Sequence, residues 1–493
     1  MSKKNVVIVG AGTAGLVIAN NLQHDFNVTI VERSKFKSYP SVYKIPMMIG
    51  ILFRKKKQKY IRNIELTLSD KRKIPFFESQ VFGGASLING CVHVFGAIAA
   101  WSNILEGFGF SIKDLFESYS RCFSKNAIEK YKISIRFSKI TDIDKAFLST
   151  LNRMGIPLGD MDSSDAQNCG QIYNTIRKVF RSSVLSLMSK NHFSLLMNEN
   201  VTNFAYDENG EVVGVNTSNG IISGDYVILA AGTLGTNRLM LGEVQRGVLN
   251  SVNHNNVGAN IQDHINLRIN VIANKEINSL NEIEHSLIKK AKILFSHLCG
   301  KPTILSGTGA TSGVHLDLNG DGRVDVRVQV LQFTESGRHG SDGRYFGNMP
   351  GFSLSITPIQ PFSKGLMGLR DGNFFVDPGY LNDDRDIDLL ISALNYCLNL
   401  LGMEPLNGYV QEIIGEELIR SDPKKYILEN IYSGHHLIGG LGQMVDENFR
   451  VKGLESLYVC DASVFQEYAA SNIHSSVVLL ADLFSRRFIK INS

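Results

Sequence analysis

The first 32 residues contain a βαβ pattern that limits the possible folds more than any other part of the sequence. Two apolar, β-branched runs, residues 5–9 and 28–31, are typical of strands buried on both faces of a parallel sheet. A glycine-rich turn with the sequence GAGTAG and a helix-like apolar segment, residues 16–22, connect them. The pattern predicts a Rossmann-like nucleotide-binding domain and therefore an α/β protein.

Each glycine of this turn has a physical task in a dinucleotide site. Gly10 would make the tight turn, Gly12 would let the backbone approach a pyrophosphate, and Gly15 would let helix and strand pack closely. Glu32 follows Gly12 by 20 residues, where a carboxylate can accept hydrogen bonds from ribose hydroxyls. The unit predicts dinucleotide binding and leaves open whether the cofactor is FAD or NAD.

The C-terminal segment from 434 to 487 combines histidines, glycines and an acidic strand end. His435 and His436 lie on a glycine-rich turn, and a β-rich strand at residues 457–460 runs into Asp461. Ser471 is a plausible N-cap for an amphipathic helix that includes residues 477–484.

Asn472 and His474 lie where this helix begins. The free N–H groups and positive dipole end of a helix favour an electron-rich group placed over them. An ordinary packed C-terminal helix with polar residues at its cap is the alternative interpretation of these residues alone.

Composition excludes several functional classes. The chain has 493 residues, enough for two or three domains, and a net charge of +4, too small to indicate nucleic-acid binding. A basic run at 54–59 is interpreted as a solvated face or as a site for an acidic partner or an anionic substrate. Asp317–Gly322 is similar to a calcium loop, but Val328 stands where a bidentate Glu is needed. We therefore expect a β-turn and no metal site.

The predicted compartment is the cytoplasm. The six cysteines form no CxxC pair or disulfide framework, which fits a reducing environment. The first residues lead into a strand rather than a signal sequence, and no apolar run approaches the roughly 18 residues of a membrane span. No membrane span is expected.

The two ends together resemble the glucose–methanol–choline (GMC) family of FAD-dependent oxidoreductases, and the likeness extends over nearly the whole chain. The matching blocks are residues 6–32, 83–89, 230–236, 257–264 and the C-terminal segment. The sequence VGANIQDH at 257–264 is similar to the family's VGxNLQDH and is the most distinctive of them.

The resemblance implies two domains. The implied FAD-binding domain is discontinuous, and the substrate-binding domain is built on an antiparallel sheet, as the strand-rich pattern from about residue 266 also suggests. The expected FAD-binding domain comprises residues 1–35, 80–100, 196–265 and 430–493; the substrate-binding domain comprises 266–429, with 36–79 and 101–195 as connecting or covering segments.

The resemblance also implies residue roles. His436 would be the general base and Asn472 would hydrogen-bond the substrate oxygen. Ile88 occupies the place of a flavin-linking histidine, so FAD would be non-covalent. His93, His435 and His474 are weaker candidates for the substrate pocket, and His264 is expected to be structural. The expected cofactor-binding residues are Gly10, Gly12, Thr13, Ala14, Gly15, Glu32, Gly83, Gly84, Ser86, Asn89, Gly90, Val201, Ala231, Gly232, Asp461, Ala462 and Asn472.

The expected activity is oxidation of a small-molecule alcohol to an aldehyde or ketone, with a hydride passing to FAD. The electron acceptor that reoxidises FAD, oxygen or another, stays open. A lyase or dehydratase with redox-silent FAD and a non-catalytic flavin-binding scaffold are the alternatives. An NAD-dependent dehydrogenase is disfavoured because its mechanism has no use for the C-terminal block.

Overall fold

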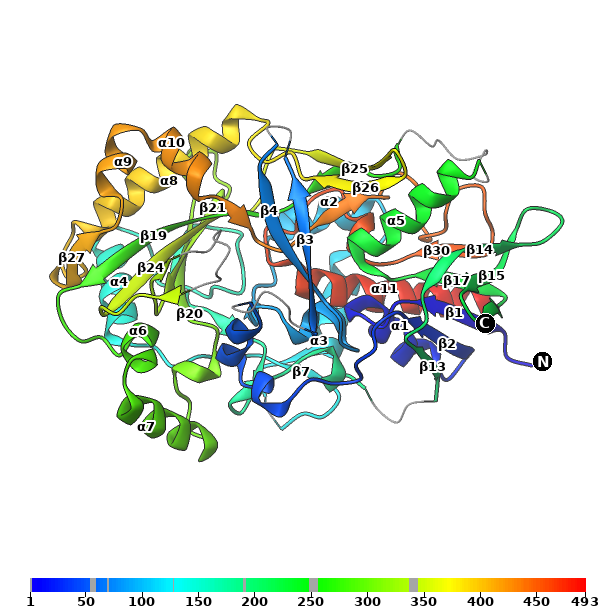
Figure 1. The fold of residues 1–493 in the computed structure, drawn as a ribbon, viewed down its shortest axis with the longest axis horizontal. Helices are drawn as coiled ribbons and strands as arrows, with labels where there is room; N and C mark the ends of the chain where they lie inside the picture. The colour runs from blue at the N-terminus through cyan, green and yellow to red at the C-terminus, as the bar shows by residue number, and fades with distance from the viewer. Residues whose placement is uncertain are drawn as a thin grey trace.

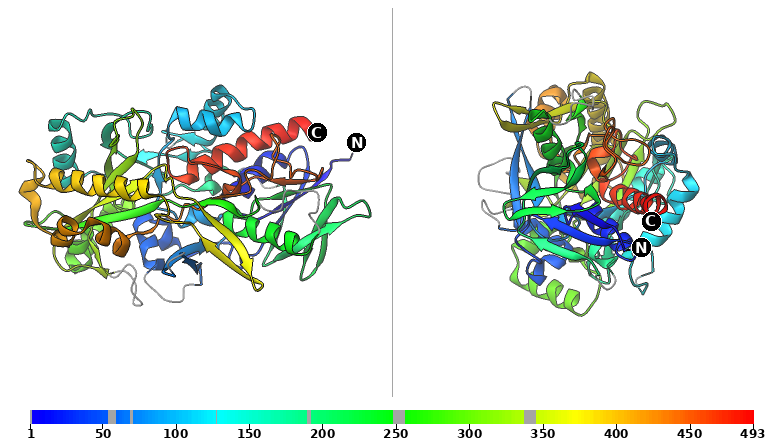
Figure 2. Two further views of the ribbon diagram at one scale, coloured as in Figure 1. Left: turned by 90° about the horizontal axis from the view of Figure 1, so that it is seen from above. Right: turned by 90° about the vertical axis from the view of Figure 1, so that its right-hand side faces the viewer.

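The computed structural model describes residues 2–53, 59–68, 71–126, 128–188, 192–247, 256–336 and 345–493. Most of the basic run, residues 54–58, lies outside these residues. The described chain forms an elongated body with a parallel sheet at one end and an antiparallel sheet at the other (Figure 1; Figure 2). The predicted α/β fold class is confirmed.

The parallel sheet has the strand order β13-β2-β1-β17-β30. Its strands are Ser194–Met197, Asn27–Glu32, Asn5–Val9, Tyr226–Leu229 and Leu457–Val459. The two N-terminal strands are the predicted apolar runs, and α1 (Thr13–Leu22) connects them. The C-terminal strand β30 pairs with β17, so the two ends of the sequence meet in one sheet.

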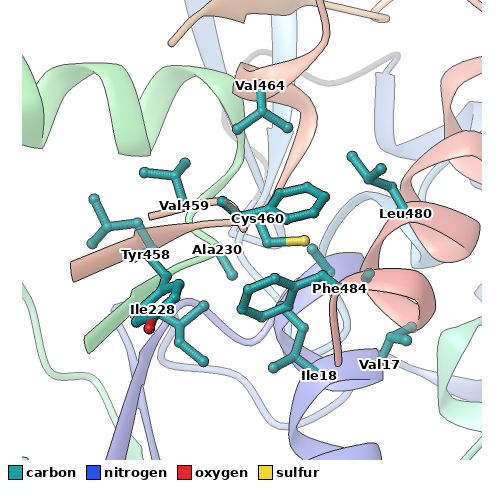
Figure 3. Close-up of a cluster of buried hydrophobic side chains, with 14 of the residues drawn as sticks. Val17, Ile18, Ile228, Ala230, Tyr458, Val459, Cys460, Val464, Leu480 and Phe484 are labelled. Atoms are coloured by element: carbon teal, nitrogen blue, oxygen red, sulfur yellow. The ribbon is translucent and has the colours of Figure 1, made fainter. Parts of the chain in front are cut away.

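The C-terminal helix α11 (Ile473–Asn492) packs against α1 and this sheet. Figure 3 shows Val17 and Ile18 of α1 meeting Leu480 and Phe484 of α11 near Ile228 of β17. The predicted N-cap Ser471 is wrong by one residue: Asn472 has the extended N-cap conformation, with φ −65° and ψ 138°. The helix also runs further in both directions than the predicted amphipathic segment because its whole inner side is buried.

The antiparallel sheet has the order β27-β19-β24-β21-β20-β9, and β28 pairs with β19 beside it. Its strands are Val410–Ile413, Ile265–Ala273, Gly351–Pro358, Val326–Leu331, Ala310–Leu316, Asn168–Gln171 and Tyr432–Ser433. The apolar side chains of β19, β21 and β24 form one core with α8 (Asp384–Leu401) and α4 (Asp142–Arg153). Since side chains alternate along a strand, the opposite face carries polar residues.

A four-stranded sheet joins the two ends of the molecule. It has the order β26-β25-β18-β29, comprising Asn373–Asp377, Gly365–Arg370, Ala259–Gln262 and Ile438–Gly440. The strand β18 belongs to the VGANIQDH segment, and β29 follows the histidine turn. Their pairing brings these two distant segments together.

Two connecting segments contain more strand than expected. Residues 36–79, expected to be a polar connection, include a hairpin of β3 (Ile61–Thr67) and β4 (Lys73–Ser79). Residues 101–195, expected to be a connecting or covering segment, contribute β9 to the antiparallel sheet. Long-range pairing partners make these strands, and local periodicity does not reveal such partners.

The remaining elements cover these sheets. The helices are α2 (Ile98–Glu106), α3 (Ile112–Cys122), α5 (Gly232–Gln245), α6 (Leu280–Glu284), α7 (Leu287–Leu298), α9 (Glu416–Ser421) and α10 (Pro423–Asn430). A three-stranded sheet contains β14 (Val201–Tyr206), β15 (Val212–Thr217) and β16 (Gly220–Ser223), with a hairpin turn between the first two. The short strands are β5 (Val92–His93), β6 (Phe123–Ser124), β7 (Ile133–Ser134), β8 (Arg136–Phe137), β10 (Tyr173–Asn174), β11 (Ile176–Arg177), β12 (Phe180–Arg181), β22 (Glu335–Ser336) and β23 (Tyr345–Phe346). Within the described residues, no helix is long and apolar enough to cross a membrane.

Candidate active site

A large cavity of about 1200 Å³ lies between the parallel and the antiparallel sheet. The carboxyl ends of β1, β2, β17 and β30 form one side, through Val9, Val31, Ala230 and Asp461. The polar face of the antiparallel sheet forms the opposite side. Ligands of open parallel sheets bind outside the carboxyl ends of the strands, so this cavity is the candidate site.

Three helix N-termini converge on the cavity. Residues at the starts of α1, α5 and α11 line it, and the N-cap residue of each helix makes no side-chain cap hydrogen bond. In α5 the first N–H, that of Gly232, donates instead to the Asp461 carboxylate. The first N–H groups of a helix have no partner within the helix, and its dipole is positive there. The cavity therefore offers several uncapped donors to an anionic or electron-rich ligand.

The glycine turn combines two closely packed glycines with one glycine that faces open space. Gly10 has φ +106°, and a Cβ at that position would lie 2.6 Å from the Ala230 carbonyl oxygen. A Cβ on Gly15 would lie 1.9 Å from the Gly10 carbonyl oxygen, so this glycine allows helix and strand to pack, and it does not line the cavity. By contrast, a Cβ on Gly12 would meet no protein atom within 4 Å. Gly12 leaves space in the cavity for a ligand.

Two acidic residues support this end of the cavity. The Glu32 carboxylate accepts hydrogen bonds from the backbone N–H of Ala11 (2.6 Å) and of Ser34 (2.7 Å), which fixes the glycine turn. Asp461 is buried, which raises its pKa, and it accepts from the N–H of Gly232 (2.8 Å) and from the Thr236 hydroxyl. Both carboxylates line the cavity while holding the backbone around it.

Most of the expected cofactor-binding residues line the cavity, and three do not. The lining residues among them are Gly10, Gly12, Thr13, Ala14, Glu32, Gly84, Asn89, Gly90, Val201, Ala231, Gly232, Asp461, Ala462 and Asn472. Gly15 is one of the three. The other two, Gly83 and Ser86, form the turn at residues 83–86: the buried Ser86 hydroxyl donates to the Gly83 carbonyl at 2.7 Å.

The predicted pair of His436 and Asn472 meets at the cavity wall. His436 Nε2 lies 3.3 Å from Asn472 Nδ2, and both residues line the cavity. Asn472 is the N-cap of α11, but its side chain makes no cap hydrogen bond. Its amide is turned toward His436, and its Oδ1 atom is buried without a hydrogen-bond partner in the described protein. An acceptor is thus left for a ligand beside the imidazole.

The neighbouring His264 determines which nitrogen of His436 carries the proton. His264 Nε2 lies 3.1 Å from the Ile359 carbonyl oxygen, which can only accept, so Nε2 carries the His264 proton. In the neutral ring, His264 Nδ1 is then an acceptor, and it lies 2.9 Å from His436 Nδ1. His436 must donate from Nδ1, so its Nε2 lone pair accepts from the Asn472 Nδ2 amide at the cavity wall.

Burial keeps both rings neutral. It lowers the pKa of His436 to about 3, with the positive charge of Arg327 as a second cause. Burial also holds the pKa of His264 well below its ordinary value, and a charge on His436 would lower it further. His264 was expected to be structural, and the structure adds that its ring hydrogen-bonds directly to the ring of His436.

The preceding residue, Asp263, holds the backbone of the histidine turn. Its carboxylate accepts from the His436 backbone N–H at 2.7 Å and from the Ser433 and Tyr380 hydroxyls. His435 has φ +61°, a backbone conformation that residues other than glycine rarely adopt. The segment 257–264 thus positions the candidate base through both its backbone and its ring.

The three weaker histidine candidates differ in position. His435 lines the cavity between the rings of Phe76 and Phe77, at centroid distances of 5.3 and 5.4 Å. His474 lines it as well, and burial lowers its pKa to about 3. His93 does not line the cavity, because its ring is buried against Tyr119 and Asp162.

Sequence reasoning missed the wall formed by the antiparallel sheet. Asn266, Arg268, Gln329 and Ser355 line the cavity from adjacent strands, and Arg268 forms a 2.6 Å ion pair with Glu335. The strict alternation of apolar and polar residues in β19 is the signal that could have found two of them.

A second part of the cavity is apolar. It is lined from α6, α7, β21 and the 3₁₀ segment Pro46–Phe53, and its residues include Leu280, Ile283, Ile293, Leu294, Leu331, Met47, Met48 and Ile49. The cavity therefore has a polar sheet wall near the histidines and an apolar arm toward α7. Within the described residues, no group of three or more His, Cys, Asp and Glu side chains could hold a metal ion.

Known proteins match this chain over nearly its whole length, in sequence and in structure. Two relatives are an alcohol dehydrogenase [acceptor] of Pseudomonas putida, 24% identical over 97% of this chain and 94% of that protein, and a pyridoxine 4-oxidase of Microbacterium luteolum, 23% identical over 99% and 100%. Among solved structures, a formate oxidase matches 100% of this chain and 99% of its own with a TM-score of 0.84 at 18% identity. A pyridoxine 4-oxidase from Mesorbium loti matches 98% and 99% with a TM-score of 0.79, also at 18% identity.

Two family models cover most of the sequence. The N-terminal GMC oxidoreductase model matches residues 5–266, more than half of the chain, and the C-terminal model matches residues 361–481. The second match contains the histidine turn and the start of α11, and the first contains the glycine turn and the His264 segment. The resemblance predicted from the sequence is confirmed, and this chain belongs to the GMC oxidoreductase family.

Proposed function

We propose that this protein is an FAD-dependent oxidoreductase that oxidises an alcohol to an aldehyde or ketone, with His436 as general base. The observation that carries the proposal is the neutral His436 ring, with its Nε2 lone pair held beside Asn472 at the cavity wall. The names of the relatives, an alcohol dehydrogenase and a pyridoxine oxidase, support an alcohol as the donor.

The cavity fits FAD. The open space at Gly12 and the uncapped start of α1 would receive the pyrophosphate, and Glu32 keeps lone pairs for a ribose. The start of α11 would favour the electron-rich edge of the flavin ring. Ile88 lines the cavity and cannot form a bond to the flavin, which supports non-covalent binding. Bound FAD would supply the acceptor for the hydride from the carbinol carbon.

The protein's own residues would move the proton. The substrate hydroxyl would replace the Asn472 amide as the donor to His436 Nε2. Its O–H bond would break, and the electrons would form the carbonyl as the carbinol hydride leaves. The Nδ1 proton of His436 would stay with that ring while His264 Nδ1 accepts its hydrogen bond. Asn472 would hold the substrate oxygen beside the base.

Anaerobic addition of an alcohol panel to the purified yellow protein, followed by air, tests the proposal. Bleaching of the flavin absorbance by an alcohol is the expected result, and recovery in air would assign oxygen as the electron acceptor. A flavin that no alcohol bleaches would favour the lyase or scaffold alternatives. A colourless protein that does not take up added FAD would overturn the proposal.

A further inference from the structure

The helix α7 (Leu287–Leu298) is oriented with its apolar side outward. Leu287, Ile288, Phe295 and Leu298 are 83%, 82%, 71% and 66% exposed, and the helix projects from the lower edge of the body in Figure 1. Large apolar side chains on a soluble protein are normally exposed singly. Four of them on one short helix indicate a surface that is covered when the protein works.

The exposed residues form one continuous stripe. At 100° per residue, Leu287, Leu294 and Leu298 lie on one line of the helix, and Ile288 and Phe295 lie beside it. The opposite side carries Lys289 and the buried His297, which face the body of the protein. A helix stabilised only by packing on its own domain would have the reverse orientation.

Lysines border the stripe on both sides. Lys290 lies along one edge next to Leu294, and the exposed Lys292 lies along the other edge next to Ile288. The helix contains no acidic residue. Lys289 is paired with Glu276 and Glu282 at 3.0 Å each, and Lys290 lies 3.9 Å from Glu284. Lys292 has no acidic partner among the described residues and supplies the free charge at the border.

This charge distribution identifies the occupant of the stripe. An apolar face bordered by lysines, which can extend their charged ends toward phosphate groups, is typical of a helix that lies in a lipid interface. In a symmetric dimer, by contrast, two copies of the same lysine-bearing face would meet. We propose that α7 docks the protein on the surface of an anionic phospholipid membrane.

The docking surface adjoins the cavity. Ile293 and Leu294 of α7 line the apolar arm, and Leu294 is also 44% exposed in the stripe. The arm therefore reaches the molecular surface at the docking helix. If the proposed function holds, an alcohol with an apolar tail could pass from the lipid into the arm; the docking itself does not depend on that activity.

Co-sedimentation of the full-length protein with lipid vesicles tests the proposal. Vesicles of phosphatidylcholine with about 30% phosphatidylglycerol should bind the protein, while pure phosphatidylcholine vesicles or about 0.5 M salt should weaken binding several-fold. The double variant Leu287→Ser, Phe295→Ser should bind the anionic vesicles at least about tenfold less, and Lys292→Glu should also weaken binding.

A matched control is the double variant Leu158→Ser, Ile221→Ser, which removes two apolar side chains, 62% and 63% exposed, from other elements. It should bind as the unmodified protein does, and thermal unfolding should show that all variants are folded. Failure of the unmodified protein to bind anionic vesicles overturns the proposal, as does an equal loss in the control. Sedimentation velocity identifies the remaining occupant: a dimer that the α7 variant converts to a monomer, without vesicle binding, would assign the stripe to a second copy.

Discussion

The two ends of the cavity position their functional groups in different ways. At the glycine end, short segments of backbone line the cavity: the open position at Gly12 and the uncapped start of α1 face it. At the histidine end, three side chains from distant parts of the sequence form one hydrogen-bonded row, with His264 and His436 separated by 172 residues. Loss of the base should therefore leave FAD binding intact, and weaker FAD binding should leave the hydrogen-bonded row intact.

The largest expected effect is at the histidine end. His436→Gln removes the base and should lower kcat/KM for an oxidised alcohol by about 10²–10⁴-fold, the usual contribution of a general base. Because the ring does not hold the glycine turn, the FAD content of the purified variant should equal that of the unmodified protein. Steady-state kinetics and the flavin absorbance measure the two quantities. His285→Gln changes an exposed histidine and should change neither. Loss of FAD from His436→Gln would contradict the separation of the two ends.

The complementary variant is Gly12→Ala. Its new methyl group meets no protein atom within 4 Å and should leave the unfolding temperature unchanged, but it would enter the space assigned to the cofactor. We expect FAD to bind at least about tenfold more weakly, a free-energy change of about 1.4 kcal/mol. Titration of the apoprotein with FAD measures this.

Gly107→Ala, at the C-cap of α2 and outside the cavity, is the matched control. The atom nearest to a Cβ added at Gly107 is the Ile104 carbonyl oxygen at 3.7 Å, so the methyl group fits without strain. Equal FAD affinity in Gly12→Ala and the unmodified protein would show that the cofactor does not occupy the space at Gly12.

The same contrast explains what could be predicted from the sequence. The glycine end was predictable because turn, helix start and acidic strand end follow one another within 32 residues, and each has a local backbone requirement. The pair of His436 and Asn472 came from the resemblance alone. The bond between His264 and His436 was not predictable, because it depends on the pairing of β18 with β29, and the sequence carries no local signal for that pairing. Arg268 of the sheet wall carried a local signal in the alternation of β19, but which face of that sheet meets the cavity depends on long-range strand pairing.

A smaller effect is expected at the positioning residue His264. Leucine at this site removes the acceptor for His436 Nδ1–H, so the proton can move to Nε2 and the base is lost in part of the molecules. We expect kcat/KM to fall about tenfold in His264→Leu. His264→Asn places an amide oxygen near the position of Nδ1 and should restore most of the rate. Nitrogen-15 NMR of the histidine rings reads the tautomer directly: a protonated Nδ1 on His436 should persist in the Asn variant and decline in the Leu variant. An unchanged tautomer in His264→Leu would show that the ring only fills space.

The smallest expected effect is the pH dependence of kcat/KM, which tests whether His436 stays shielded from water during turnover. Burial lowers the pKa of His436 to about 3, and only the neutral ring can accept a proton. We therefore expect kcat/KM to stay level as pH falls through 6.5, where a solvated imidazole would already be half protonated.

The lowered pKa of His436 also affects folding stability. Between pH 6.5 and 3 the unfolded chain binds a proton at His436 that the folded chain does not, so folding stability falls as pH falls through this range. His436→Gln removes this contribution, and its unfolding temperature should therefore decline less steeply between pH 6.5 and 4.5 than that of the unmodified protein. An acid limb of kcat/KM at or above pH 6.5 would mean that the ring meets water during turnover, and the histidine end would then be a mobile site rather than a preorganised one.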